Sequence, residues 1–208
     1  MSEYYIPSAP GEAEFTEKRS RFLGHVRCIE TEDEAKAFVA EMKKKYYDAR
    51  HNCWCYIIRN GAERYSDDGE PQGTAGIPML EVLRRQNMTN CVCVVTRYFG
   101  GVLLGAGGLT RAYAKSAKDA LDAAGKARMR LWSAVTVDCP YPMLERLKLL
   151  AAAHGGTVEG TDFGAAVSVR ILLPQENAAG FDAALTELSA GTMTARREGE
   201  RFLPGPRE

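Results

Sequence analysis

The stretch Cys91-Val92-Cys93-Val94-Val95-Thr96-Arg97-Tyr98-Phe99-Gly100-Gly101 joins an apolar run to a glycine-rich loop. Residues 91–96 are nearly all apolar, which predicts a strand that is buried on both faces. The loop continues to Gly108, and a helix is predicted from Leu109 to Ala124. The apolar residues of that helix recur at the helical period and are mostly small, so the helix can pack closely against a sheet.

The residues before this stretch predict a mixed α+β domain. A capping box at Thr31 and Glu34 starts a helix that ends near Lys45. Strands are predicted over residues 12–28, 51–59 and 62–66, with Asn60-Gly61 forming a hairpin turn between the last two. A polar loop, 67–73, leads to a helix that Thr74 caps and that ends near Arg85.

The residues after Gly125 have a different pattern, and we place a domain boundary there. In order, they predict a strand over 129–139, a helix over 142–153, strands over 156–161 and 165–173, a helix over 175–189 and a strand over 192–202. This βαββαβ order is that of a ferredoxin-like domain. We therefore predict an α+β chain with domains at 1–126 and 127–208, and a loose tail from Pro204.

The composition limits the classes of function. Lys and Arg together number 27, as do Asp and Glu, so nucleic acid would have to bind a local basic patch. No apolar run is long enough to span a membrane, and the N-terminus does not resemble a signal peptide. These features predict a cytoplasmic protein with no membrane partner.

The six cysteines include the pairs Cys53/Cys55 and Cys91/Cys93. Residues two apart on a strand face the same side, so adjacent strands could bring four thiols together. Zinc sites, however, use cysteines separated by two residues on turns rather than cysteines within apolar strands. We therefore predict buried, reduced, metal-free cysteines, with the remaining two, Cys28 and Cys139, also in the core.

The loop that contains Asp67, Asp68 and Glu70 concentrates three carboxylates in four residues. Such a loop suits a hard cation such as Mg²⁺, whose preferred ligands are carboxylate oxygens and water. The same residues, with Gly69 and Pro71, are also ordinary turn chemistry. The alternatives are therefore a cation site, a loop that orients nearby arginines, and a solvated turn.

The glycine loop follows a strand and precedes a helix, so its amides could face an anion. It lacks the lysine of a P-loop and the third glycine of a dinucleotide fingerprint. The alternative is a close backbone crossing, where no side chain fits. Our candidate nucleic-acid or anion-binding residues are the following: His51, Arg97, Tyr98, Gly100, Gly101, Gly107, Gly108 and Arg111.

Within this set, each residue type has a distinct expected role. Arg97 and Arg111 could flank one phosphate, and Tyr98 and Phe99 could stack on single-stranded RNA. His51 could contact phosphate; its spacing from Cys53 does not by itself produce an activated nucleophile. Because loops at the carboxyl ends of strands meet the N-termini of the following helices, we expect Asp67–Gly76 and Arg97–Arg111 to converge on one surface.

The same motifs resemble the YigZ/IMPACT family. The resemblance rests on Lys18-Arg19-Ser20-Arg21-Phe22, His51-Asn52-Cys53, Ser66 to Pro78, and Val94 to Leu109. It implies a first domain of the ribosomal protein S5 domain 2 type and a second domain similar to the last domain of elongation factor G. The eukaryotic members regulate translation.

Two functional hypotheses follow. The first is a translation-linked regulator, without catalysis or cofactor, that binds RNA, the ribosome or a translation-associated protein through its first domain. The second is a metal- or phosphate-dependent hydrolase that uses Asp67, Asp68 and Glu70 with Arg97. The first is preferred because the sequence contains no complete catalytic set.

Overall fold

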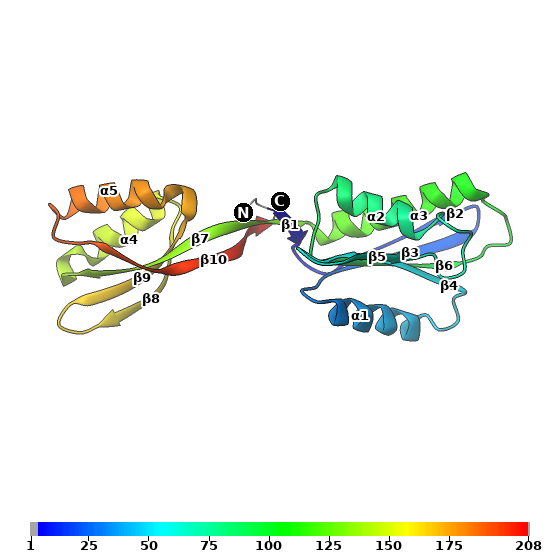
Figure 1. Cartoon of the computed structure of the whole chain (residues 1–208), viewed down its shortest axis with the longest axis horizontal. Coiled ribbons are helices and arrows are strands. Elements are labelled where there is room, and N and C mark those ends of the chain that lie inside the picture. Colours follow the sequence, from blue (N-terminus) through cyan, green and yellow to red (C-terminus); the bar gives the residue numbers. More distant parts are fainter. Residues whose placement is uncertain (1–3, 208) are drawn as a thin grey trace. The chain divides into compact units, whose positions relative to one another are not determined.

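The computed structural model describes residues 4–207, and its side chains through residue 204. The chain divides into two compact units (Figure 1). The first unit contains the residues up to Arg128 together with those from Pro204 onward, and the second is Met129–Leu203. Each unit has its own hydrophobic core.

The first unit is built on an antiparallel five-stranded sheet of order β2-β3-β6-β4-β5. Its elements are β1 (Tyr4–Pro7), β2 (Gly11–Glu17), β3 (Ser20–Cys28), α1 (Glu32–Lys45), β4 (His51–Ile57), β5 (Glu63–Ser66), α2 (Gly76–Arg85), β6 (Cys91–Tyr98) and α3 (Ala106–Ala124). The predicted apolar strand is therefore β6, at the centre of the sheet. The sequence did not predict β1, which is only four residues long.

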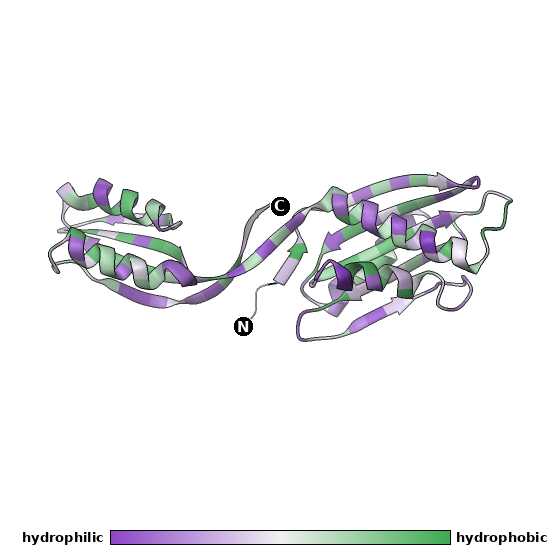
Figure 2. Ribbon diagram, turned by 90° about the horizontal axis from the view of Figure 1, so that it is seen from above, coloured by the Kyte–Doolittle hydropathy of each residue, from purple (hydrophilic) through white to green (hydrophobic). Residues whose placement is uncertain are grey.

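Helices cover both faces of this sheet: α2 and α3 lie on one side and α1 on the other (Figure 1). Alternate residues of β6 pack into the hydrophobic clusters on the two faces of this sheet. Cys93 and Val95 face α2 and α3, and Val92 and Val94 face α1. This confirms the prediction of a strand buried on both faces. Hydrophilic and hydrophobic residues alternate along α3 (Figure 2), as expected for a helix that packs one face on a sheet.

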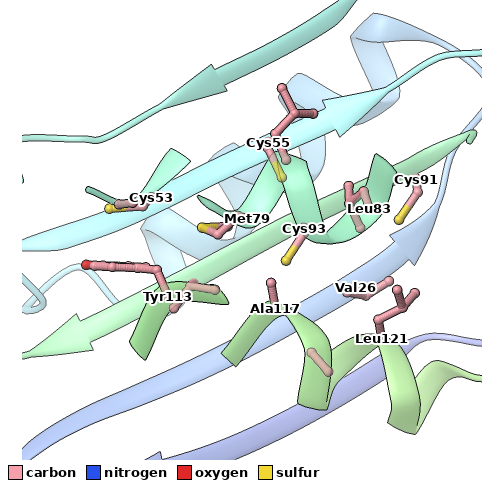
Figure 3. Close-up of a cluster of buried hydrophobic side chains, with 14 of the residues drawn as sticks. Val26, Cys53, Cys55, Met79, Leu83, Cys91, Cys93, Tyr113, Ala117 and Leu121 are labelled. Atoms are coloured by element: carbon pink, nitrogen blue, oxygen red, sulfur yellow. The ribbon is translucent and has the colours of Figure 1, made fainter. Parts of the chain in front are cut away.

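Four cysteines lie together on the sheet face that α2 and α3 cover (Figure 3). Cys55 on β4 is directly opposite Cys93 on β6. Burial raises the pKa of the Cys55 and Cys91 thiols well above the ordinary value, which keeps both groups protonated and unreactive. The prediction for Cys28 is wrong: it is the last residue of β3, and it is exposed.

The second unit confirms the predicted βαββαβ order. Its elements are β7 (Lys126–Cys139), α4 (Leu144–Ala153), β8 (Thr157–Phe163), β9 (Val167–Pro174), α5 (Ala178–Leu188) and β10 (Ala195–Arg207), with short 3-10 turns at Tyr141–Met143 and Gln175–Asn177. The strands form a sheet of order β10-β7-β9-β8, to which β1 adds beside β7. Both helices pack on one face of it, so the fold is ferredoxin-like.

The C-terminal end differs from our expectation. Instead of a loose tail from Pro204, strand β10 continues to Arg207. Proline can occupy an edge strand, because the amide that it lacks is not needed for pairing on the open side. Among the residues described, no helix is both long and apolar enough to cross a membrane.

Candidate functional site at the carboxyl ends of β5 and β6

Strands β5 and β6 are both antiparallel to β4, so they run in the same direction and end at the same edge of the sheet. β5 ends at Ser66 before the loop to α2, and β6 ends at Tyr98 before the loop to α3. β3 and β4 begin at this edge, at Ser20 and His51. Every motif of the family resemblance therefore contributes residues to one end of the first unit.

Asp67 caps helix α2 from outside the helix. Its carboxylate accepts hydrogen bonds from the backbone amides of Gly73 at 2.8 Å, Ala75 at 3.0 Å and Gly76 at 2.8 Å. The predicted cap, Thr74, does not cap the helix: the N-cap residue is Ala75, and the Thr74 hydroxyl donates to the carbonyl of Pro71. A carboxylate at a helix N-terminus is stabilised by the free amides and by the helix dipole.

Asp68 ties the acidic loop to α1 and β4. Its carboxylate accepts from Lys43 Nζ at 2.6 Å and from the amide of Asn52 at 2.8 Å. Its carbonyl oxygen lies 3.0 Å from His51 Nδ1. The thiol of Cys53 donates to the carbonyl of Asp67. The loop is therefore held to the start of β4 by both side chains and backbone.

Glu70 joins the two candidate loops in the interior. Its Oε1 atom accepts from Arg97 Nη1 at 2.7 Å and from the hydroxyl of Tyr113 on α3 at 2.8 Å. The Arg97 and Glu70 side chains are only 6% and 4% exposed. Burial raises the pKa of Tyr113 far above its ordinary value, with the nearby Cys53 as the next cause. The phenol therefore remains a hydrogen-bond donor to Glu70 at all physiological pH values.

The backbone of the glycine loop crosses the β2–β3 turn closely at Gly100. A Cβ atom there would lie 2.0 Å from the carbonyl carbon of Arg19, so only glycine fits. The hydroxyl of Ser20 accepts from the Gly100 amide at 3.2 Å and lies 3.4 Å from Arg97 Nη2. Ser20 therefore links the glycine loop to the buried ion pair.

The arrangement corrects our expectation that Arg97 and Arg111 flank one phosphate. The Arg97 guanidinium is buried against Glu70, whereas Arg111 is exposed on α3. Glu70 therefore orients an arginine, Arg97, which is one of the roles considered for the acidic loop. Tyr98 points to the opposite face of the sheet, where its hydroxyl donates to Asp48, and this hydrogen bond is the main reason that its pKa rises to about 12.

The solvent side of this edge is basic and partly apolar. The N-cap residue of helix α3 is Gly105, which has no side chain that could cap the first amides of the helix. Gly107 and Gly108 lie in the first turn. A hollow of about 170 Å³ beside that turn is lined by Phe15, Glu17, Lys18, Leu104, Gly108, Arg111, Ala112 and Lys115. In the loop before α3, which is hydrophobic in Figure 2, Leu103 is 82% exposed; Phe99 at its start is 53% exposed.

Sequence reasoning did not assign a role to three residues of this edge: Ser20, Tyr113 and Lys115. Tyr113 had a signal, since a buried phenol in a stripe of small apolar residues needs a hydrogen-bond partner. Lys115 lies one helical turn after Arg111, so the two share a face of α3. Ser20 had no signal of its own, because its role depends on the pairing of β3 with β6.

Comparisons with known proteins agree with the motifs. Residues 18–121 match the Impact N-terminal domain, and residues 137–192 match a domain of unknown function, DUF1949. The chain is 34% identical over 202 residues to the IMPACT family member YvyE of Bacillus subtilis, covering 96% of this chain and 93% of that protein. It is 35% identical over 197 residues to the IMPACT family member YigZ of Escherichia coli, covering 93% and 97%.

The likeness extends to a mammalian protein and to a solved structure. Protein IMPACT of Rattus norvegicus is 31% identical over 105 residues, which is 48% of this chain and 33% of that protein. A crystal structure of a hypothetical protein matches with a TM-score of 0.60 and 34% identity, covering 94% of this chain and 97% of that one. On this sequence and structural evidence, the chain belongs to the IMPACT family.

Proposed function

We propose that this protein is a cytoplasmic, translation-linked regulator that binds RNA on the ribosome through the exposed edge of its first unit. Family membership supports the link to translation. The observation that carries the RNA contact is the basic hollow beside the uncapped start of α3, where Lys18, Arg111 and Lys115 gather around an apolar floor. Cations beside free helix amides suit a phosphate, and the exposed ring of Phe99 suits a base.

The buried residues of this edge act as its scaffold rather than as ligands. Arg97 and Glu70 hold the glycine loop against the acidic loop, and Gly100 allows the backbone to cross Arg19. Phosphate contacts fall to the cations of this edge that remain exposed, namely Lys18, Arg19, Arg111 and Lys115. Of the candidates from the sequence, Gly107, Gly108 and Arg111 keep the proposed anion-binding role, whereas Arg97 and His51 position the loops.

The hydrolase alternative is less well supported, because internal donors already engage the acidic loop. Three amides bind Asp67, Lys43 and an amide bind Asp68, and Arg97 and Tyr113 bind Glu70. A carboxylate that acts as a general base or metal ligand needs free lone pairs directed at a reacting group. Each of these three carboxylates already accepts hydrogen bonds from donors of the fold, which favours a binding protein.

The test is a double substitution of exposed cations, Lys18→Ala with Arg111→Ala. Ribosome co-sedimentation and fluorescence anisotropy with a single-stranded RNA would be measured over a salt series. We expect weaker binding and a salt slope reduced by about 0.7 for each phosphate that the variant no longer neutralises. The matched control is Lys36→Ala with Lys44→Ala, two exposed cations of α1 on the other side of the sheet.

The proposal is wrong if the two double variants bind RNA and ribosomes equally at every salt concentration. Weaker ribosome association with unchanged affinity for free RNA would indicate a ribosomal protein as the partner instead of RNA. Thermal unfolding of each variant distinguishes a weakened binding surface from an unfolded protein.

A further inference from the structure

The second unit leaves one face of its four-stranded sheet uncovered. Helices α4 and α5 pack on the other face, over the core that contains Val135, Val137 and Ile171. The uncovered face bounds a hollow of about 710 Å³, far larger than the hollow beside α3. Ala134, Thr136 and Ser168 line it. These are small side chains on the two central strands, β7 and β9, so they form a shallow floor.

Arginines lie across this floor, held by carboxylates from the edge strands. Arg170 on β9 is paired with Asp162 on β8, and it occupies the space above Gly160, where a Cβ atom would lie 2.3 Å from its guanidinium. Arg201 on β10 is paired with Glu159, which sits at the irregularity of the β8–β9 pairing. A bulge of this kind redirects a side chain, and here Glu159 meets an arginine from the opposite edge of the sheet.

A third arginine is shared between two acids. Arg196 lies 3.5 Å from Asp138 and 3.2 Å from Glu198. Asp138 also accepts from the hydroxyl of Ser168. One guanidinium thus serves two carboxylates, which leaves this part of the face with an excess of negative charge.

The face extends beyond the main hollow. A second hollow of about 430 Å³ shares Asp162 and Ser168 with it and is also lined by Asp138. Among the side chains that the structure describes, the two hollows together contain five carboxylates, Asp138, Glu159, Asp162, Glu198 and Glu200, and three arginines. A surface with this balance repels a phosphate backbone and attracts cationic groups.

We propose that this open sheet face docks a Lys/Arg-rich, extended segment of a partner protein. The partner's Lys and Arg side chains would replace the arginines of this face as partners of its carboxylates. The displaced arginines would then donate hydrogen bonds to backbone carbonyls of the partner segment. The continuous pair of hollows suits a chain in extended conformation, and the small floor residues leave room for its side chains. This surface belongs to the second unit alone, so the inference does not depend on RNA binding by the first.

The test uses the full chain and a fluorescein-labelled nonapeptide of alternating Arg and Gly, with a nonapeptide of alternating Asp and Gly as the charge control. Binding would be followed by fluorescence anisotropy at low salt. We expect Asp138→Asn with Asp162→Asn to weaken binding of the Arg peptide about tenfold, since the variant removes two exposed charge contacts that are each weak. Arg196→Gln frees both of its carboxylates, and it should tighten binding severalfold.

The matched control is Glu145→Gln with Glu187→Gln, which removes the same charge from exposed positions on α4 and α5. Equal affinity of the two double variants for the Arg peptide would overturn the proposal. The proposal would also be overturned if the double variant Arg170→Ala with Arg196→Ala bound single-stranded RNA more weakly than the parent protein. That result would show that the face binds RNA. Failure of RNA binding by the first unit would leave the peptide result unchanged, so the two proposals fail separately.

Discussion

The two units use the same kind of ion pair in opposite ways. In the first unit, Arg97 and Glu70 are buried at the sheet edge, and each also contacts a hydroxyl group. In the second unit, Arg170 and Asp162 lie on an open sheet face, 51% and 64% exposed. A buried pair fixes one arrangement, because either partner alone is a costly buried charge. An exposed pair contributes little to stability, so its partners are free to exchange.

The largest effect should come from breaking the buried pair. Glu70→Gln leaves the Arg97 guanidinium buried without a counter-charge, and it should lower the free energy of unfolding by about 3–5 kcal/mol. Asp162→Asn is the matched change on the second unit and should cost less than about 1 kcal/mol. Urea unfolding measures both, and equal losses of stability would refute the contrast between the units.

The next effect concerns the backbone crossing. Gly100→Ala places a methyl group against the backbone of Arg19 and should destabilise the first unit by about 1–3 kcal/mol. Gly107→Ala is the control in the neighbouring helix turn, where the new Cβ meets only the far end of the Arg111 side chain at 3.5 Å. It should be neutral or stabilising by up to about 1 kcal/mol. A thermal scan of both variants would show whether steric fit, rather than glycine content, explains the loop.

A smaller effect should follow from removal of the α2 cap. Asp67→Ala removes the acceptor of three amides and should cost about 0.5–2 kcal/mol. Amide hydrogen exchange provides a sharper readout: Gly73, Ala75 and Gly76 should exchange faster in this variant. Thr74→Val should leave those three amides protected. The reverse result would restore Thr74 as the cap.

The smallest effect is a pH dependence that originates at His25. Burial lowers the pKa of this histidine, and Glu12 only partly opposes the shift. The unfolded chain therefore takes up a proton near pH 6.5 while the folded chain stays neutral. The free energy of unfolding should fall as pH drops below about 6.5, by at most about 1.4 kcal/mol per pH unit. His25→Gln should flatten this pH dependence. Urea titrations at about pH 7.5, 6.5 and 5.5, which bracket the ordinary pKa of histidine, would measure it. An unchanged slope in the variant would show that the pH dependence originates at another group.

Much of the fold followed from local patterns. The apolar run of β6, the small-residue stripe of α3 and the alternation in β7 and β9 each identify an element by its period. The errors occurred where local signals are short or ambiguous. β1 is too short to show a period, and the segment expected to be a loose tail from Pro204 instead continues strand β10.

The candidate site was less predictable, since its chemistry depends on burial. Strand direction alone predicted that the two loops meet at one edge, and the Glu70–Arg97 contact lies where they meet. Strand direction did not show which charged side chains are buried. One signal was present: alternation along β6 puts Arg97 on the same face as Cys93 and Val95, and Tyr98 on the other. The capping role of Asp67 had no such signal, because its amide partners come from a loop conformation that only the structure defines.

The Glu70 cluster also has a consequence for how the chain folds. Its contacts join residues separated in sequence by 27, 43 and 77 positions. Contacts of such long range form only after the intervening loops have closed, which slows folding. The pairing of β3 with β6 spans equally long separations, so we expect this edge to form together with the docking of β3, β6 and α3 and not before it. During refolding, the Tyr113 hydroxyl should reach Glu70 only once the sheet and α3 are in place, so a newly made chain would complete this edge only when its first unit is nearly folded.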